Sequence, residues 1–219
     1  MAIGSGAVVG PAATIPNRTT PGRPERARRS HFHAAALSIL AAEGAAGLRV
    51  GSLCRSLKVT SGSFYHHFTG WADFVRTLLD SHERRQVALL SGLSEPCGRD
   101  AEAMFVLRMT LLALPHDVEA AVRGWAATAP DVRATQRRID TGRGAQLEKF
   151  LSGVVDDPVT AQRMAVLAVA VVAGYQQTCA PPAPAVLEHL LEDYERIVVG
   201  YSISRQDCHN AEKHGTAPG

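Results

Sequence analysis

Side chains that can donate and accept hydrogen bonds are concentrated in one stretch near the N-terminus, from Val59 to Phe68. Its polar members are Thr60, Ser61, Ser63, Tyr65, His66 and His67. Hydroxyl and imidazole groups bind phosphate oxygens and the edges of nucleic-acid bases. Phe64 and Phe68 are four residues apart, so they share one face of a helix. The stretch therefore predicts a short helix with a buried apolar face and a polar face that is free for contact.

Metal binding and catalysis are not favoured by the sequence. His66 and His67 are adjacent, and adjacent side chains on a helix point about 100° apart, so they do not converge on one ion. The chain has no Ser-His-Asp spacing, no glycine-rich phosphate loop and no HExxH motif. We therefore expect no enzyme activity, no metal and no cofactor. A small helical enzyme is the weakest of the alternatives that we consider.

Three short helices are expected to position the polar stretch. The first, about Ser30–Glu43, has an apolar stripe at helical spacing and is followed by Gly44, a residue that favours helix ends. The second, about Val50–Leu57, repeats the same spacing and includes Cys54 as a small core residue. The third begins near Thr60 or Ser61, where either hydroxyl can cap it. A tight turn between the second and third helices is typical of a helix-turn-helix.

The rest of the chain also shows helical periodicity, and no segment alternates with period two for long. Breaks fall at Ser91–Arg99 and at prolines, of which Pro158 suits the first turn of a helix. We expect helices near Trp71–Leu90, Ala101–Leu114, Val118–Thr128, Asp131–Leu151, Pro158–Thr178 and Ala185–Ser204. The fold class is therefore all-α, with an N-terminal three-helix helix-turn-helix domain and a C-terminal helical bundle.

Four domains or segments follow from this pattern. Residues 1–25 form a flexible basic arm rich in Gly, Pro, Ala and Thr, and residues 26–72 form the helix-turn-helix domain. Residues 73–205 form the domain for effector binding and dimerisation, and residues 206–219 form a frayed polar tail.

Charge is distributed unevenly along the chain, whose net charge is +2. Residues 1–70 hold eight Lys and Arg against two acids, and the remainder holds 15 basic and 19 acidic residues. A basic N-terminal segment on an acidic body favours a polyanionic partner for that segment, with a solvated basic tail as the alternative. Four cysteines lie far apart, which favours a reducing cytoplasm over a disulfide framework. The longest apolar run, Met164–Tyr175, is too short to cross a bilayer, and no signal peptide is expected.

The stretch Val59-Thr60-Ser61-Gly62-Ser63-Phe64-Tyr65-His66-His67-Phe68, within Gly44–Phe74, resembles the DNA-binding domain of the tetracycline-repressor (TetR) family. The C-terminal half matches more weakly. Residues Val122–Thr128, Pro130 and Arg138-Ile139-Asp140 are similar to a stretch found in one subset of members.

The resemblance implies a role for each matching residue. Ser61 and Ser63 would face bases, and Thr60, Tyr65 and His67 would contact phosphates, while the residues themselves also allow phosphate contact by His66 and close approach at Gly62. The basic candidates are Arg28 and Arg29 before the first helix, Arg49 and Lys58. The chain departs from the family at Leu57-Lys58, where many members have Ala-Gly, at Arg49, where many have Thr, and at Trp71, where many have Lys.

The helices of the C-terminal half are expected to enclose a cavity for a small-molecule effector of unknown identity. The candidates for its lining are Met104, Arg108, Met109, His116, Trp125, Gln146, Phe150 and Tyr175. Trp125 leads them because a large ring tolerates a cavity edge and its N–H requires a partner. Each of the eight can equally be a core residue.

We therefore expect a cytoplasmic, ligand-responsive transcriptional repressor that binds a palindromic operator in double-stranded DNA as a homodimer. The last two helices, with small residues Ala168, Ala170, Ala173 and Gly174, would pair with their copies. The alternative is a helical effector-binding or scaffolding protein that has lost DNA recognition. Trp71 is the residue that favours it.

Overall fold

The computed structural model describes residues 23–93, 100–179 and 182–214, and side chains within 28–93, 101–179 and 182–201. In these ranges the chain forms helices and no strand, which confirms the expected all-α fold. The helices are α1 (Arg23–Gly47), α2 (Val50–Leu57), α3 (Ser61–His67), α4 (Trp71–Ser91), α5 (Asp100–Leu112), α6 (His116–Ala126), α7 (Pro130–Leu151), α8 (Pro158–Thr178) and α9 (Pro184–His214).

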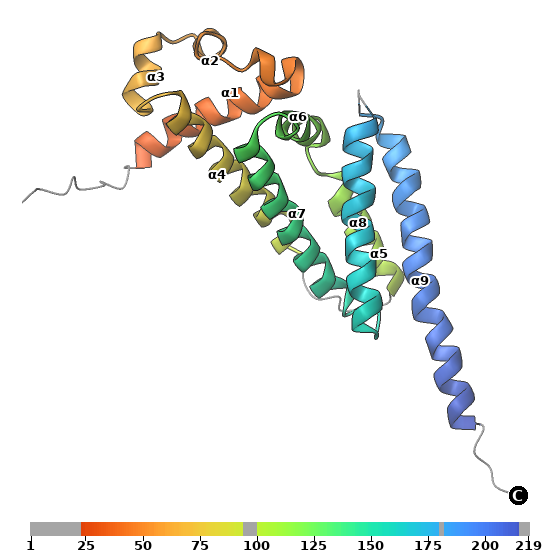
Figure 1. Cartoon of the computed structure of the whole chain (residues 1–219). Coiled ribbons are helices and arrows are strands. Elements are labelled where there is room, and N and C mark those ends of the chain that lie inside the picture. Colours follow the sequence, from red (N-terminus) through yellow and green to blue (C-terminus); the bar gives the residue numbers. More distant parts are fainter. Residues whose placement is uncertain (1–22, 94–99, 180–181, 215–219) are drawn as a thin grey trace, which may run out of the picture.

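Helices α1 to α3 form an N-terminal domain around a core of their own (Figure 1). Phe32, Leu40, Leu53 and Phe64 are buried there together with Phe74 from α4. The backbone at Gly44 has a φ of 68°, a left-handed conformation that suits glycine, as the sequence predicted. The helix begins at Arg23, so residues 23–25 are helical and do not belong to an arm. The rest of the expected arm, residues 1–22, lies outside the described residues.

The turn between α2 and α3 is tight. Lys58 adopts a φ of 55°, and the backbone N–H of Val59 donates to the carbonyl oxygen of Cys54 at 2.9 Å. The thiol of Cys54 donates to the carbonyl oxygen of Thr60 at 3.6 Å. Burial of this thiol raises its pKa, so Cys54 is the core residue that the sequence predicted.

The C-terminal helices enclose a second core in which Met104, Leu107, Leu147, Phe150 and Leu151 are buried. Figure 1 shows α4 and α7 running side by side, with α8 between α7 and α9. The first half of α4 contributes Phe74 and Leu78 to the first core, and Leu90 near its end belongs to the second. Helix α4 therefore joins the two domains, as expected from its length.

Most helix boundaries lie within two residues of the predicted ones, and the exceptions are at the two ends. Pro158 stands in the first turn of α8, where the Asp157 carboxylate accepts from the backbone N–H of Thr160 at 3.1 Å. Helix α9 continues to His214, ten residues beyond the predicted end, so residues 206–214 are helical and not frayed. Residues 94–99, 180–181 and 215–219, which include most of the predicted break and part of the proline cluster, lie outside the described residues.

Helix α8 is, among the described residues, the one helix that is long and apolar enough to cross a membrane by length and composition. Its mean hydropathy is 1.3 over the relevant window, of which 33% is buried. Core helices of globular proteins pass the same test. In this structure Ala161, Met164, Ala165 and Ala168 of α8 lie in the second core, so the helix has a buried face and an exposed apolar face.

Candidate nucleic-acid interface

Helix α3 presents a small polar face to solvent. Ser61, Gly62, Tyr65 and His66 are exposed, Ser63 is half-buried, and Thr60 just before the helix is exposed. Tyr65 keeps 60% of its surface accessible, a large value for an aromatic side chain. The side chains that the sequence assigned to contact are therefore accessible on one short helix, with the exception of His67.

A cluster of aromatic rings holds α3 from behind. The Phe64 ring is completely buried and lies 5.8 Å from Phe32, 5.1 Å from Phe68 and 5.4 Å from Phe74, measured between ring centroids. Edge-to-face arrangements at these separations are favourable. Because Phe32 comes from α1 and Phe74 from α4, the orientation of α3 is fixed by two other helices.

His67 differs from the expectation. Only 5% of its surface is exposed, and its ring lies 5.9 Å from that of Phe32. His67 is three residues after Phe64, and positions three apart share a helix face. The prediction that His67 faces outward as a phosphate contact is therefore wrong, and His66, on the exposed face, is the accessible histidine of the pair.

Two local features of α3 bear on how closely another molecule can approach it. The Thr60 side chain makes no capping hydrogen bond, contrary to the expectation of a hydroxyl cap, so its hydroxyl is free to bind elsewhere. A Cβ on Gly62 would contact only the Thr60 hydroxyl oxygen, at 3.6 Å. The fold therefore does not require glycine at position 62.

Basic side chains surround this face. Arg28, Arg49 and Lys58 are exposed, at the start of α1, before α2 and in the turn before α3. The Arg29 guanidinium stacks over the Phe68 ring at 5.2 Å from its centroid, so α1 holds this cation beside the end of α3. Arg55, exposed in the last turn of α2, is a further basic residue near the turn that the sequence analysis did not single out. Its position after the buried pair Leu53 and Cys54 could have indicated its exposure.

The start of α4 completes the surface. The Asp73 carboxylate accepts from the backbone N–H of Thr69 at 3.2 Å and from Arg76 at 2.5 Å. Burial raises the pKa of Asp73, but these hydrogen bonds and the charges of Arg76 and Arg29 outweigh it, and the pKa lies below its usual value. Trp71, in place of the lysine of the resemblance, is 37% exposed and packs on Phe74 at 5.3 Å.

The eight residues predicted to line an effector pocket are not brought together by one cavity among those that the described residues line. Met104, Phe150 and Tyr175 are buried in the second core, and Met109 is 49% exposed. His116 and Gln146 are half-buried. Arg108 on α5 lies at the surface, paired with Glu192 of α9 at 3.0 Å, and lines one cavity there. Trp125 lines another, between α4, α6 and α7.

A buried layer of polar residues lies between the two cores, and the sequence analysis did not predict it. We call it the polar layer, and it consists of Gln86, Glu119, Arg123, Asp140, Arg143 and Gln176. Arg143 donates to both carboxylate oxygens of Glu119, at 2.8 Å for Nη1, and Nη2 also donates to Gln86 at 2.6 Å. Arg123 donates to both oxygens of Asp140, at 2.8 and 2.6 Å.

Gln176 of α8 connects the two ion pairs of the polar layer. It accepts from Arg123 Nε at 2.8 Å and donates to Glu119 at 2.7 Å. The layer therefore joins α4, α6, α7 and α8 through charge-assisted hydrogen bonds, which are stronger than neutral ones. His116, one of the effector candidates, contacts this layer through Gln176 at 3.2 Å and stacks edge-on against Tyr175 at 5.3 Å.

His82, buried on α4 next to the polar layer, makes stability depend on pH. Burial, opposed by Glu119 and reinforced by the charges of Arg143 and Arg85, lowers the pKa of His82 from 6.5 to about 4. Between these values only the unfolded chain binds the proton, so the free energy of unfolding falls as the pH falls from about 6.5 to about 4. We expect His82 to contribute on the order of 2 kcal/mol to this loss.

Urea unfolding at about pH 7.5 and about pH 4.5 measures this contribution. His82→Gln should lose on the order of 2 kcal/mol less than the parent between the two conditions. The same loss in both proteins would show that His82 does not carry the effect.

Solved structures with a similar fold are transcriptional regulators. A regulator from Rhodococcus sp. Rha1 is 25% identical with a TM-score of 0.65, and the match covers 78% of this chain and 96% of that one. A putative TetR-family regulator from Rhodococcus sp. is 18% identical with a TM-score of 0.61, over 79% of this chain and 99% of that one. Reduced NemR from E. coli is 18% identical with a TM-score of 0.62, over 79% and 96% of the two chains.

No protein-family model and no curated protein matches the sequence. The structural similarity nevertheless extends over both domains and almost the whole length of each solved chain. It confirms the fold that the resemblance of Val59–Phe68 implied, and the regulatory role of the neighbours agrees with a DNA-binding regulator.

Proposed function

We propose that this chain, which has the fold of TetR/AcrR-family transcriptional regulators, is a cytoplasmic, ligand-responsive repressor that binds a palindromic operator as a homodimer. The single observation that carries the proposal is the exposed polar face of α3, held on a rigid aromatic core. A helix fits the DNA major groove, where base edges can be distinguished. Ser61 and Ser63 would face the bases, and the absence of a side chain at Gly62 would let the backbone approach them.

The phosphate contacts of the proposal come from accessible side chains around α3. Tyr65 and Thr60 lie on or next to the helix, and Lys58 and Arg49 flank it. Lysine and arginine side chains release counterions from the DNA when they contact phosphates, so binding should weaken with salt. Arg29 would act from its stacked position on Phe68, and Arg28 from the preceding turn of α1.

Dimerisation is proposed through α8 and α9. Val159 and Val166 on α8 are each 63% exposed, and Val186, Leu190 and Ile197 on α9 also have large exposed fractions. These exposed residues recur at helical spacing along the two helices, and pairing with a second copy would form a four-helix bundle. Ala170 lies on the exposed face, whereas Ala168 is fully buried in the second core and is not part of this surface.

Effector response is proposed to act through α4, which belongs to both cores. An effector that binds one position of α4 more tightly than another would shift the spacing of the two α3 helices of a dimer. Linkage requires that DNA weaken effector binding by the same factor. A titration in which the two ligands bind independently would contradict this coupling.

Gly62→Ala tests the approach of α3 to the bases. Alanine favours helix over glycine by about 0.5–1 kcal/mol, and the new Cβ meets no clash, so the free energy of unfolding should rise. DNA binding should nevertheless weaken, by about 1–2 kcal/mol, because the methyl group would lie between the helix and the groove floor. Urea unfolding and fluorescence anisotropy with a duplex from upstream of the chain's own coding region measure the two effects. A variant that is more stable and binds the duplex as tightly as the parent would argue against this approach.

The second candidate function is a helical effector-binding or scaffolding protein without DNA recognition. The observation in its favour is Trp71, an exposed indole at a position where the resemblance implies a phosphate-binding lysine. The two functions differ in one simple respect. The repressor binds duplex DNA with an affinity that falls as salt rises, and the alternative does not bind it.

A further inference from the structure

Both tryptophans of the chain line one cleft between the two domains. The cleft has a volume of about 610 Å³ and is formed by the first half of α4, by α6 and by the start of α7. Trp71 enters it from α4 and Trp125 from α6, and Thr135 and Leu79 are among the other lining residues. This volume lies within the range of small-molecule sites. We call it the indole cleft.

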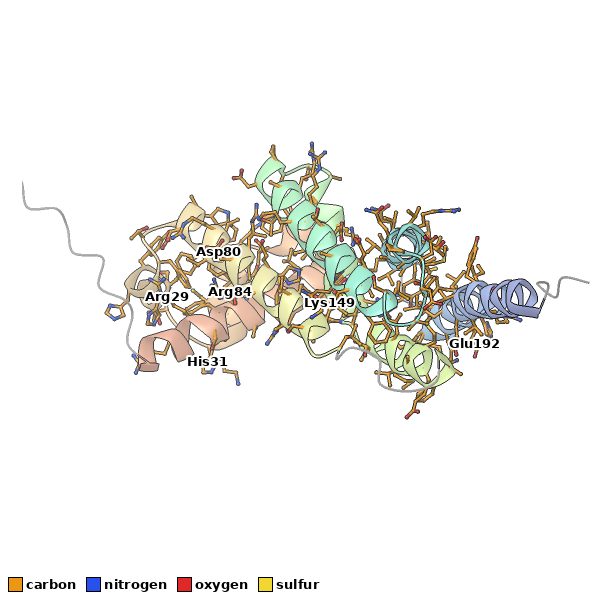
Figure 2. All side chains as sticks on the ribbon, turned by 90° about the horizontal axis from the view of Figure 1, so that it is seen from below. Arg29, His31, Asp80, Arg84, Lys149 and Glu192 are labelled. Atoms are coloured by element: carbon orange, nitrogen blue, oxygen red, sulfur yellow. The ribbon has the colours of Figure 1, made fainter. Side chains whose placement is uncertain are left out.

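Charged groups at the rim of the indole cleft give it an excess of carboxylates. Arg76 is paired with Asp73 and Asp80 on α4, and Arg138 is paired with Glu83 at 2.7 Å. Asp131, in the first turn of α7, also lines the cleft and has no ion-pair partner within the described part of the chain. Among the lining residues and their ion-pair partners, four carboxylates therefore face two guanidinium groups. Figure 2 labels Asp80, the α4 member of this set, one turn before Arg84.

We propose that the indole cleft binds a planar aromatic cation. Indole rings attract cations through their π faces more strongly than other aromatic side chains, and they stack on flat rings. The excess of carboxylates supplies the complementary charge. An exposed indole at Trp71 costs solvation that the packing of the domain does not require, since one side of the ring already rests on Phe74.

Occupancy of the cleft has a direct mechanical consequence. One wall is the part of α4 that follows α3, and the other wall is α6 and α7 of the C-terminal domain. A ligand held between the walls fixes their separation and hence the position of α4. The inference deepens the proposed function by naming the chemical class of its effector, and only this effect on DNA binding rests on that function.

The two tryptophans provide their own assay. The chain has no others, so its intrinsic tryptophan fluorescence reports on the cleft alone. The probes are N-methylquinolinium, a planar aromatic cation, and quinoline, which has nearly the same shape and is neutral at neutral pH. For the full chain without DNA we expect saturable quenching by N-methylquinolinium, with a Kd below about 1 mM, and binding of quinoline that is weaker by about tenfold.

Variants separate the two parts of the site. Asp131→Asn should weaken binding of the cation by about threefold to tenfold and leave quinoline unchanged. Trp71→Leu should weaken both, and because Trp71 is partly exposed this variant should still fold, leaving Trp125 as the reporter. Asp156→Asn removes an exposed carboxylate in the loop before α8 and serves as the matched control, with unchanged binding.

Three results would overturn the inference. They are quenching that stays linear up to about 5 mM probe, as for free tryptophan, equal affinity for the two probes, and equal weakening by Asp131→Asn and Asp156→Asn. The assay contains no DNA, so failure of the repressor function leaves these outcomes unaffected. If the cation binds as expected but does not change duplex affinity, the site stands and its identification as the effector site is wrong.

Discussion

Glu119→Gln is expected to lower the free energy of unfolding by about 3–5 kcal/mol, because it leaves the buried Arg143 cation without a counter-ion. Glu119 and Arg143 are 1% and 5% exposed. The Glu119 carboxylate accepts from Arg143 and from Gln176, so an amide NH₂ in its place would meet donors. An unsatisfied buried polar group costs about 1–3 kcal/mol in addition to the unpaired charge. Urea unfolding followed by circular dichroism measures the change.

Two controls distinguish the ion pair from a general effect of removing a carboxylate. Glu83→Gln removes the partner of the largely exposed Arg138 and should cost less than about 1 kcal/mol, because solvent screens that pair. The double variant Glu119→Leu with Arg143→Met removes both buried charges and should recover at least half of the loss. A loss below about 1 kcal/mol for Glu119→Gln would show that the polar layer does not hold α4, α6 and α7 together.

The helices could be predicted because their residues obey local rules. Gly44 ends the predicted first helix in a left-handed conformation, and Pro158 and Asp157 mark the start of α8. Local rules failed where nothing in the sequence marks an end. The polar residues after Ser204 are compatible with helix, and α9 continues through them to His214. The seven residues before Ser30 are likewise helical, although their charge suggested an arm.

The polar face of α3 was predictable from spacing alone, and the one error there has a simple cause. Phe64 and Phe68 define the buried face, and His67 lies beside them on the helical wheel. Residue type suggested contact with DNA, whereas position indicated burial. For a short helix packed against two others, position is the stronger signal.

The effector residues could not be placed from sequence because helical periodicity predicts burial but not which helices enclose a cavity. Met104 and Phe150 satisfy the pattern and are core, whereas Met109 satisfies it and is exposed. The polar layer was missed for a related reason. Glu119 and Arg143 resemble surface residues of amphipathic helices until the packing of α6 on α7 brings them together.

Ser61→Glu carries the second large expected effect, on DNA binding. Ser61 is the first residue of α3 and is exposed, and a carboxylate is favourable at a helix N-terminus, so the fold should be unaffected or slightly stabilised. In the proposed complex the same carboxylate would stand in the groove between two phosphate backbones. Like charges in such an interface cost several kcal/mol, and we expect a loss of about 3–4 kcal/mol, or more than about a hundredfold in affinity.

Thr141→Glu is the matched control, since it adds the same charge at an exposed position of α7 in the C-terminal domain. The decisive measurement is the affinity of the parent and both variants for the upstream duplex, by fluorescence anisotropy over a range of salt concentrations. The parent and Thr141→Glu should bind with equal affinity and steep salt dependence, and Ser61→Glu should not bind detectably while unfolding at an unchanged urea concentration. Equal duplex binding by Ser61→Glu and Thr141→Glu would contradict the entry of α3 into the groove.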